Sequence, residues 1–211
     1  MPLDINLIVG GEAGQGIQTI GFVLGKTLVR SGWHVFADQD YESRIRGGHN
    51  FYRVRASDRA VRAQTEKLDI LVAMDRRTVD LHVNELKDNG MIIVDKQVLG
   101  IDSRWPHVLD VQLEKLAEEA AGDKITANSV AAGAVIGLIG GDLSLLSEVL
   151  TRQFAKNTEK VREYNLKAAR VGYEFAAQRR PVDFIRLPQS GKADPKMFLN
   201  GNEALSLWAV A

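Results

Sequence analysis

The sequence predicts an α/β fold, with an open, largely parallel sheet and helices on both of its faces. Short apolar runs alternate with segments of helical periodicity along the chain. A glycine-rich turn lies between the first apolar run and the first helical segment. The chain has 211 residues, 45% of them hydrophobic, which is enough for one α/β domain with its own core, or for one domain and a tail.

The first four elements follow one another closely. Residues 5–9 are a short apolar run that ends in Gly10-Gly11, as is typical of a buried strand. Residues 17–30 carry apolar side chains at helical spacing, with one stripe that faces the core. Ser31-Gly32 ends this helix, and residues 33–37 form a second strand. Strand, glycine turn, helix and strand make a βαβ unit, which favours a parallel sheet covered by helices.

The later part of the chain continues this alternation. Apolar runs predict three further strands, at residues 49–55, 70–74 and 91–94. A crossover helix is predicted at residues 78–87, closed by Asn89-Gly90. Helical periodicity predicts three more helices, at residues 113–121, 130–139 and 158–178.

Composition and charge exclude several classes of function. The chain has 27 Lys and Arg against 27 Asp and Glu, which argues against a nucleic-acid binder with a broad basic face. It has no cysteine, which excludes disulfides, an iron–sulfur cluster on this chain, a cysteine nucleophile and thiolate zinc sites. The longest nearly uncharged stretch, residues 125–141, is shorter than the roughly 20 residues that span a bilayer. No signal peptide is recognised, so we expect a soluble, cytoplasmic protein without membrane attachment.

A glycine loop, residues 11–16 with the sequence Gly-Glu-Ala-Gly-Gln-Gly, follows the first strand and opens the first helix. Backbone N–H groups at such a helix N-terminus suit an anion such as phosphate. The loop is not a Walker A motif, because Ile17-Gln18 follows Gly16 instead of Lys and Ser or Thr. As a dinucleotide fingerprint it has Ala13 at the second glycine, and Asp38 lies about where a ribose-binding acid would be. Three interpretations stay open: a packing turn, a stand-alone NAD- or FAD-binding Rossmann domain, and a site for a phosphate-bearing ligand or a partner's cofactor.

A second cluster, residues 41–49, places Arg44 and Arg46 before Gly47-Gly48. Arginine binds phosphate or carboxylate with two parallel hydrogen bonds, and paired glycines permit backbone conformations that other residues avoid. Ligands collect at one edge of the sheet in such folds, which favours an anion or interface site beside the glycine loop. The alternative is a hairpin turn with solvated arginines.

No complete catalytic set is present in the sequence. The four histidines lack metal-ligand spacing, and no serine-hydrolase elbow occurs. Asp69, Asp75 and Asp95 flank strand ends, where an acid serves equally well to cap a helix. We therefore expect no catalytic residue and no metal site on this chain, and a domain that serves a partner's active site.

The composition changes near the C-terminus. Three of the five prolines fall within residues 181–195, and residues 181–199 are predicted to be a Pro-rich linker after a domain of residues 1–180. Residues 200–211 look like a turn that opens a new apolar helix.

At this point the motifs resemble a known family. Gly-Glu-Ala-Gly-Gln-Gly, about thirty residues before Arg-Gly-Gly-His, resembles the gamma subunit or gamma domain of the 2-oxoacid:ferredoxin (acceptor) oxidoreductases. Residues 90–95 and the helix start from Ala127 to Gly133 add to the resemblance, which covers residues 5–180. Residues 201–204 resemble the start of the alpha-type, pyrimidine-binding domain, so residues 200–211 are expected to be its truncated beginning in a fused gamma–alpha subunit. One departure is Ala13, where other members carry glycine.

The resemblance implies a complex that oxidatively decarboxylates a 2-oxoacid with coenzyme A and passes electrons to ferredoxin. Thiamine diphosphate with Mg would lie between the alpha part and a beta-type subunit, and the iron–sulfur cluster would belong to a partner. The fused layout favours 2-oxoglutarate or broad 2-oxoacid use over pyruvate. The gamma part would support assembly and border the coenzyme A route, with the isolated chain inactive and with no cofactor held firmly by it. The expected cofactor-binding residues are Gly11, Gly14, Gln15, Gly16, Arg46, Gly47 and Gly48.

Overall fold

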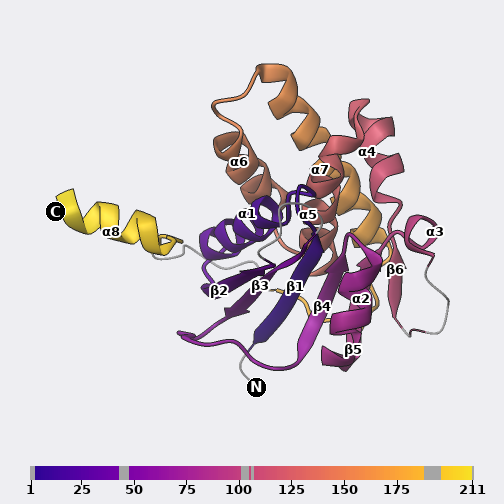
Figure 1. The fold of residues 1–211 in the computed structure, drawn as a ribbon, viewed down its shortest axis with the longest axis horizontal. Coiled ribbons are helices and arrows are strands. Elements are labelled where there is room, and N and C mark those ends of the chain that lie inside the picture. The colour runs from indigo at the N-terminus through magenta and orange to yellow at the C-terminus, as the bar shows by residue number, and fades with distance from the viewer. Residues whose placement is uncertain (1–2, 43–47, 101–104, 106, 188–195, 211) are drawn as a thin grey trace.

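The computed structural model describes residues 3–42, 48–100, 105, 107–187 and 196–210. Six strands form one sheet in the order β2-β3-β1-β4-β5-β6 (Figure 1). The strands are β1 (Asp4–Glu12), β2 (His34–Tyr41), β3 (His49–Ser57), β4 (Leu68–Ala73), β5 (Leu86–Val94) and β6 (Val108–Asp110).

The sheet is mixed but mostly parallel. β1, β4, β5 and β6 pair with one another in parallel, in that order. β3 pairs antiparallel with both β1 and β2. The first and second strands are therefore not neighbours, because β3 lies between them. The short connection between β2 and β3 favours a hairpin, and β3 then fills the place beside β1. The prediction of a largely parallel sheet is confirmed, whereas the predicted βαβ unit of neighbouring parallel strands at the N-terminus is wrong.

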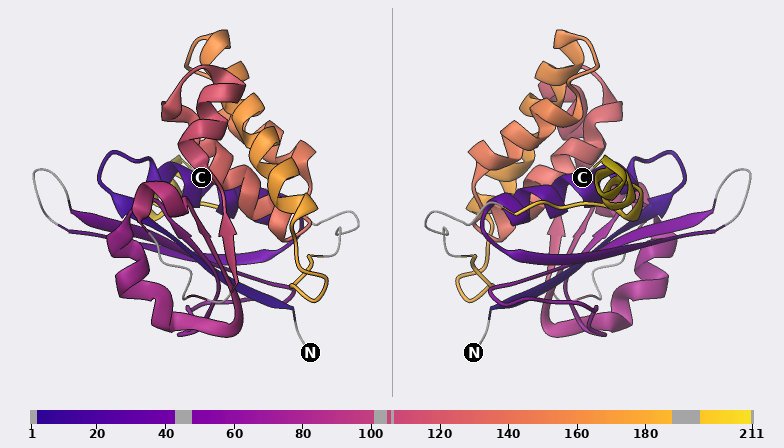
Figure 2. Two further views of the ribbon diagram at one scale, coloured as in Figure 1. Left: turned by 90° about the vertical axis from the view of Figure 1, so that its right-hand side faces the viewer. Right: turned by 90° about the vertical axis from the view of Figure 1, so that its left-hand side faces the viewer.

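Helices cover both faces of the sheet, as predicted (Figure 2). One face packs against α1, α5 and the helices behind them, and the other face packs against α2. The helices of four or more residues are α1 (Ile17–Arg30), α2 (Arg76–His82), α3 (Lys96–Leu99), α4 (Leu113–Ala121), α5 (Ala127–Leu138), α6 (Leu143–Gln153), α7 (Glu159–Gln178) and α8 (Gly201–Val210). No helix in the described part of the chain is long and apolar enough to cross a membrane.

The crossover between β4 and β5 differs from its prediction. α2 ends at His82 and a 3₁₀ turn, Val83–Glu85, leads directly into β5. Asn89-Gly90, predicted to close the helix, lies inside β5. The register shifts there, since Leu68 pairs with Leu86 while Ile70 already pairs with Met91. This irregular strand start carries polar residues that resemble a helix stop. The sequence also missed β6, α3 and α6.

α5 and α7 form the closest helix pair of the domain. α5 is buried on almost all sides, as expected for a helix that is apolar all round. A Cβ on Gly133 would lie 1.9 Å from the carbonyl oxygen of Ala169, and one on Gly172 would lie 2.1 Å from that of Val130. Only glycine permits this backbone approach, which sets how closely α7 packs on the central helix.

Candidate functional site

A crevice lies outside the carboxyl ends of β1, β4 and β5, where α/β sheets usually bind ligands. Its cavity measures about 170 Å³. The glycine loop forms one wall, and the start of α5 forms another. The lining residues are Gly14, Gln15, Ala73, Met74, Asp95, Val98, Leu99, Leu113, Glu114, Lys124, Ile125, Ala127 and Asn128.

The glycine loop is held by its own glutamine. Gln15 Oε1 accepts the Glu12 N–H at 2.8 Å, and Gln15 Nε2 donates to the Met74 carbonyl oxygen at 3.2 Å. A Cβ on Gly11 would lie 2.4 Å from Gln15 Oε1. Gly11 and Gln15 therefore shape the loop, and the Gln15 amide is already used within the protein.

Gly14 and Gly16 give the loop its conformation. Their φ angles are +99° and +78°, in the left-handed region that favours glycine. A Cβ on Gly16 would lie 2.6 Å from Asn128 Nδ2, whereas one on Gly14 would meet no atom within 4 Å. Gly14 therefore leaves open space above the loop, and Gly16 lets α5 approach it.

The structure brings Gly48 beside the glycine loop. The Ala13 N–H donates to the Gly48 carbonyl oxygen at 3.2 Å. Arg46 and Gly47, the other residues predicted for this edge, lie outside the described residues. The two motifs of the sequence thus meet at the carboxyl end of β1.

Helix α1 begins without a side-chain cap beside the crevice, whereas α5 continues directly from a 3₁₀ turn, Lys124–Thr126, that the Asp123 side chain caps. Neither Gly16, at the start of α1, nor Thr126, at the start of α5, makes a side-chain capping hydrogen bond, and neither helix has an acid in its first turn. α2, α3, α6 and α7, in contrast, are each capped by an Asp or Thr side chain. Uncapped N-terminal N–H groups and the helix dipole favour an anion.

Sequence reasoning missed the contribution of Lys124 and Asn128 to this site. Lys124 Nζ lies 3.4 Å from Glu114 Oε2, and the two side chains are 58% and 50% exposed. Val98 and Ile125, exposed by 58% and 77%, add an apolar rim. The sequence indicated a helix start at Ala127-Asn128, but nothing in it indicated that this helix start faces the glycine loop. Apart from the carboxylates of Asp95 and Glu114, the described lining is cationic, amide and apolar, which suits an anion attached to an apolar group.

The crevice can bind but lacks a reactive set. The described part of its lining contains no histidine, serine or cysteine, and the carboxylate of Asp95 accepts the Val98 N–H at the start of α3. No group of three or more metal-ligating side chains occurs among the described residues. The absence of cysteine from the sequence rules out holding an iron–sulfur cluster by thiolates. The groups present therefore do not fit a cluster or a thiamine-bound Mg²⁺, but they do fit a phosphate-bearing substrate.

On the opposite side of β1, a buried histidine pair adjoins the loop. His49 Nε2 lies 3.2 Å from His82 Nε2, and His82 Nδ1 lies 2.6 Å from Glu85 Oε1. Burial lowers the pKa of His49 from 6.5; Asp75 and Glu42 oppose this, while His82 and Arg77 add to it. His49 is the last residue of the Arg-Gly-Gly-His motif, and no role had been predicted for it.

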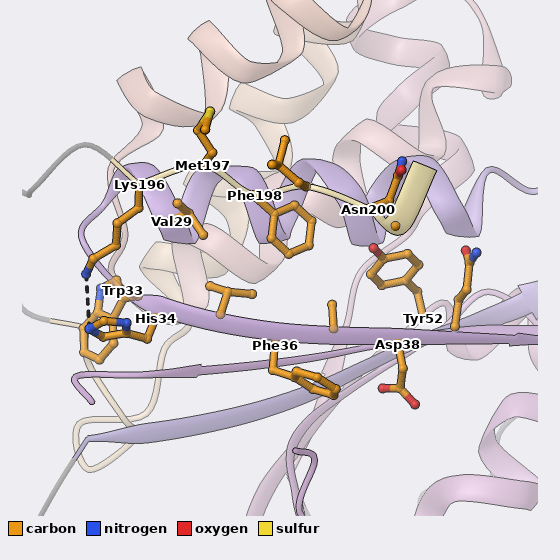
Figure 3. Close-up of a pocket in the computed structure, with 15 residues that line it drawn as sticks. Val29, Trp33, His34, Phe36, Asp38, Tyr52, Lys196, Met197, Phe198 and Asn200 are labelled. Carbon is orange, nitrogen blue, oxygen red and sulfur yellow. Dashed lines mark hydrogen bonds between the residues drawn. The ribbon is translucent and has the colours of Figure 1, made fainter. Parts of the chain in front are cut away.

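The dinucleotide alternative fits the geometry poorly. Asp38 lies within β2, and the insertion of β3 places that strand two inter-strand spacings, about 10 Å, from β1. The Asp38 carboxylate accepts a hydrogen bond from Gln64 Nε2. Asp38 instead lines a second cavity, of about 670 Å³, at the outer edge of the sheet (Figure 3).

This second cavity is closed by the segment of residues 196–200. Phe198 packs on Phe22 with ring centroids 5.7 Å apart, and a Cβ on Gly25 would lie 2.7 Å from the Phe198 ring. Lys196 Nζ donates to the Gly32 carbonyl oxygen at 3.0 Å and lies 3.3 Å from His34 Nε2 (Figure 3). α8 follows, and its large apolar side chains are exposed. They are Leu205, Leu207, Trp208 and Val210.

Comparison with known proteins adds to this geometry. Residues 6–175 match the family described as pyruvate ferredoxin/flavodoxin oxidoreductase. The chain is 30% identical over 177 residues to the 2-oxoglutarate synthase subunit KorC of Methanothermobacter thermautotrophicus, covering 79% of this chain and 92% of that subunit. The first curated relatives are alpha subunits of 2-oxoacid:ferredoxin oxidoreductases, and the chain spans about 15% of their length.

Two solved structures share the fold. One is the 2-oxoglutarate:ferredoxin oxidoreductase of Magnetococcus marinus, with 2-oxoglutarate, coenzyme A and succinyl-CoA bound. It has a TM-score of 0.87 and 25% identity, over 98% of this chain and 37% of that one. The other is a keto/oxoacid ferredoxin oxidoreductase gamma subunit of Geobacter sulfurreducens. It has a TM-score of 0.69 and 24% identity, over 82% of this chain and 99% of that subunit. The chain belongs to the pyruvate ferredoxin/flavodoxin oxidoreductase family.

Proposed function

We propose that this chain supports assembly and coenzyme A handling in a complex that oxidises a 2-oxoacid with coenzyme A, forming acyl-CoA, CO₂ and a reduced acceptor. The observation that carries the proposal is the crevice, in which the uncapped N-terminus of α1 and Lys124 adjoin one cavity beside the glycine loop. Coenzyme A combines several phosphates with a pantetheine arm that has methyl and methylene groups, which matches Lys124, the start of α1 and the rim of Val98 and Ile125.

The catalytic groups of such a complex would reside on partners. An alpha-type domain and a beta-type subunit would hold thiamine diphosphate with Mg, a partner would hold the iron–sulfur cluster, and ferredoxin would accept electrons. The lack of cysteine and of a metal-ligating cluster among the described residues supports this division. The names of the relatives favour 2-oxoglutarate or a range of 2-oxoacids as substrate.

The proposal includes the domain organisation predicted from sequence. Residues 1–180 would be the gamma-type domain, residues 181–199 a linker and residues 200–211 the opening of an alpha-type domain. The exposed apolar side chains of α8 support this assignment, because such a surface normally lies against another part of a protein. A relative from Aeropyrum pernix carries similarity to 99% of this chain within one longer alpha subunit.

Purification of the tagged chain from its native cells tests the proposal. The eluate is assayed for thiamine diphosphate, iron and coenzyme A-dependent dye reduction with several 2-oxoacids. A brown, active eluate that contains a beta-type partner is the expected result. A colourless chain that purifies without partners and binds NAD or FAD would overturn the proposal in favour of the stand-alone Rossmann domain.

Two substitutions then locate the coenzyme A contact. Lys124→Ala is expected to weaken coenzyme A binding about five- to tenfold, since a charge-assisted hydrogen bond contributes roughly 1–1.4 kcal/mol at an exposed site. Lys115→Ala, an exposed lysine of the neighbouring α4, is the matched control. Arg46→Ala tests the second motif, and its role would be withdrawn if both coenzyme A affinity and assembly were unchanged.

A further inference from the structure

The buried pair of His49 and His82 is a hydrogen-bonded chain that the proposed function leaves unused. His49 and His82 are 7% and 6% exposed, and their Nε2 atoms lie 3.2 Å apart. His82 Nδ1 lies 2.6 Å from Glu85 Oε1, and Arg53 donates to Glu85 Oε2 at 2.6 Å. Phe51 packs edge-on against His82, with ring centroids 5.0 Å apart.

The partners define the proton positions. A carboxylate only accepts, so His82 Nδ1 carries the proton that faces Glu85. In the neutral pair, His82 Nε2 is then an acceptor and His49 Nε2 is the donor. His49 Nδ1 is left without a proton, and it is buried without a hydrogen-bond partner among the described residues. A further proton on His49 would sit on this nitrogen, as a buried donor with nothing to bond.

The pair is connected directly to the glycine loop. His49 pairs with Glu12 in the β1–β3 ladder, and Gly48, the residue before it, accepts the Ala13 N–H at 3.2 Å. α2, which carries His82, also contacts β1, where a Cβ on Gly10 would lie 2.5 Å from Thr78 Cγ2. A change in the contact between His82 and His49 therefore acts on the backbone that holds Glu12 and Ala13.

We propose that His82 is a positioning residue for the glycine loop, that it acts through His49, and that uptake of a proton at His49 Nδ1 in acid releases this hold. One consequence, that coenzyme A binds more weakly in acid, rests on the proposed function. The loop itself is expected to loosen whether or not coenzyme A is the ligand.

The charged groups around the pair set the direction of this effect. Asp75, at the start of α2, and Glu42, after β2, favour a charged His49, whereas Arg77 of α2 and His82 disfavour it. Arg77 also forms an ion pair with Glu42, which reduces the effect of that carboxylate. Glu85 lies against His82 and is shared with Arg53 of β3. Burial is the largest influence on His49 and keeps it neutral near pH 7.

Hydrogen exchange of the full chain tests the proposal, with rates corrected for the intrinsic effect of pH. Protection of the backbone amides of residues 10–16 should fall on the order of tenfold between pH 7.5 and pH 5.5, within the tenfold per pH unit that one proton allows. Amides of α5 report global opening and should keep their protection. His49→Gln, which hydrogen-bonds without titrating, should keep the loop protected at both pH values, and His82→Leu should leave it open at both. His34→Gln, a half-buried histidine of β2, is the matched control and should behave as the wild type.

Three results would overturn the proposal. One is equal protection of residues 10–16 at both pH values in the wild type, and another is an undiminished pH effect in His49→Gln. The third comes from ¹⁵N NMR of the imidazole rings, which should show the proton of His82 on Nδ1 and that of His49 on Nε2 at pH 7.5, so other tautomers would contradict it. This measurement needs no variant. A coenzyme A titration at both pH values tests the proposed function separately. Absence of binding at either pH would count against that function, whereas the exchange rates of the loop would still decide whether the histidine pair holds the loop.

Discussion

Gln15 joins the ends of two parallel strands by donating from Nε2 to the carbonyl oxygen of Met74 at 3.2 Å. The same side chain accepts the Glu12 N–H at 2.8 Å. The glycine loop after β1 is thereby tied to the end of β4. A residue predicted to bind a ligand thus has a structural role that the sequence motif did not indicate.

We expect Gln15→Ala to lower the free energy of unfolding by about 1–3 kcal/mol, because it leaves a backbone donor and acceptor without their partner. Urea denaturation measures this change. Gln18→Ala, at an exposed position of α1, is the control and should stay within about 0.5 kcal/mol of the wild type. Equal stability of the two variants would show that water replaces both hydrogen bonds.

Gly133→Ala is expected to destabilise the protein by about 3 kcal/mol or more, since the added methyl group would lie 1.9 Å from the Ala169 carbonyl oxygen. α7 would have to move away from α5, which opens the central core. Thermal and chemical unfolding both report the loss. Gly201→Ala is the matched substitution, because no atom lies within 4 Å of its Cβ position, and it should be neutral. A stable Gly133→Ala protein would contradict the close α5–α7 packing.

Stability should depend on pH through His49. Burial lowers the pKa of His49 in the folded state below 6.5, its value in the unfolded chain. Above pH 6.5 both states are neutral and the contribution is fully present. As the pH falls below 6.5 the unfolded chain binds the proton first, so stability decreases until the folded pKa is reached, with a slope of at most about 1.4 kcal/mol per pH unit. Urea unfolding between pH 5 and pH 8 should give a flatter curve for His49→Gln than for His34→Gln. Parallel curves would show that His49 does not titrate differently in the two states.

The segment of residues 196–200 should be released by Phe198→Ala. Burial of a phenyl ring contributes about 1.5–3 kcal/mol, so trypsin cleavage after Lys196 should accelerate at least about tenfold while the fold persists. Met197→Ala is the control, because Met197 is 75% exposed and lies next to the same bond. Unchanged cleavage in Phe198→Ala would mean that the ring does not hold the segment against α1.

Local pattern was sufficient for most of the elements. The stripe of residues 17–30 and the run of residues 113–121 have the boundaries of α1 and α4 in the structure. Thr158, the first residue of the predicted long helix, is the N-cap of α7. The prediction was wrong at Asn89-Gly90, where polar residues belong to an irregular strand start, because turn-forming residues occur in both settings.

Only part of the candidate site could be predicted from the sequence. Gly14 and Gly16 have the positive φ angles that a glycine loop requires, and this is a local property. Asn128 and Lys124 reach the same crevice from α5 and the turn before it, far along the chain. His82 reaches His49 from α2. No spacing in the sequence records such contacts.

The sequence by itself determined the alternation of strands and helices, the glycine loop and the absence of cysteine chemistry, because periodicity and residue type are local properties of the sequence. Tertiary structure alone decided that β3 lies between β1 and β2, that Asp38 is thereby removed from the loop, and that α5 faces it. Strand order and helix placement follow from long-range hydrogen bonding and burial across the whole sheet, and these energies depend on which distant segments meet.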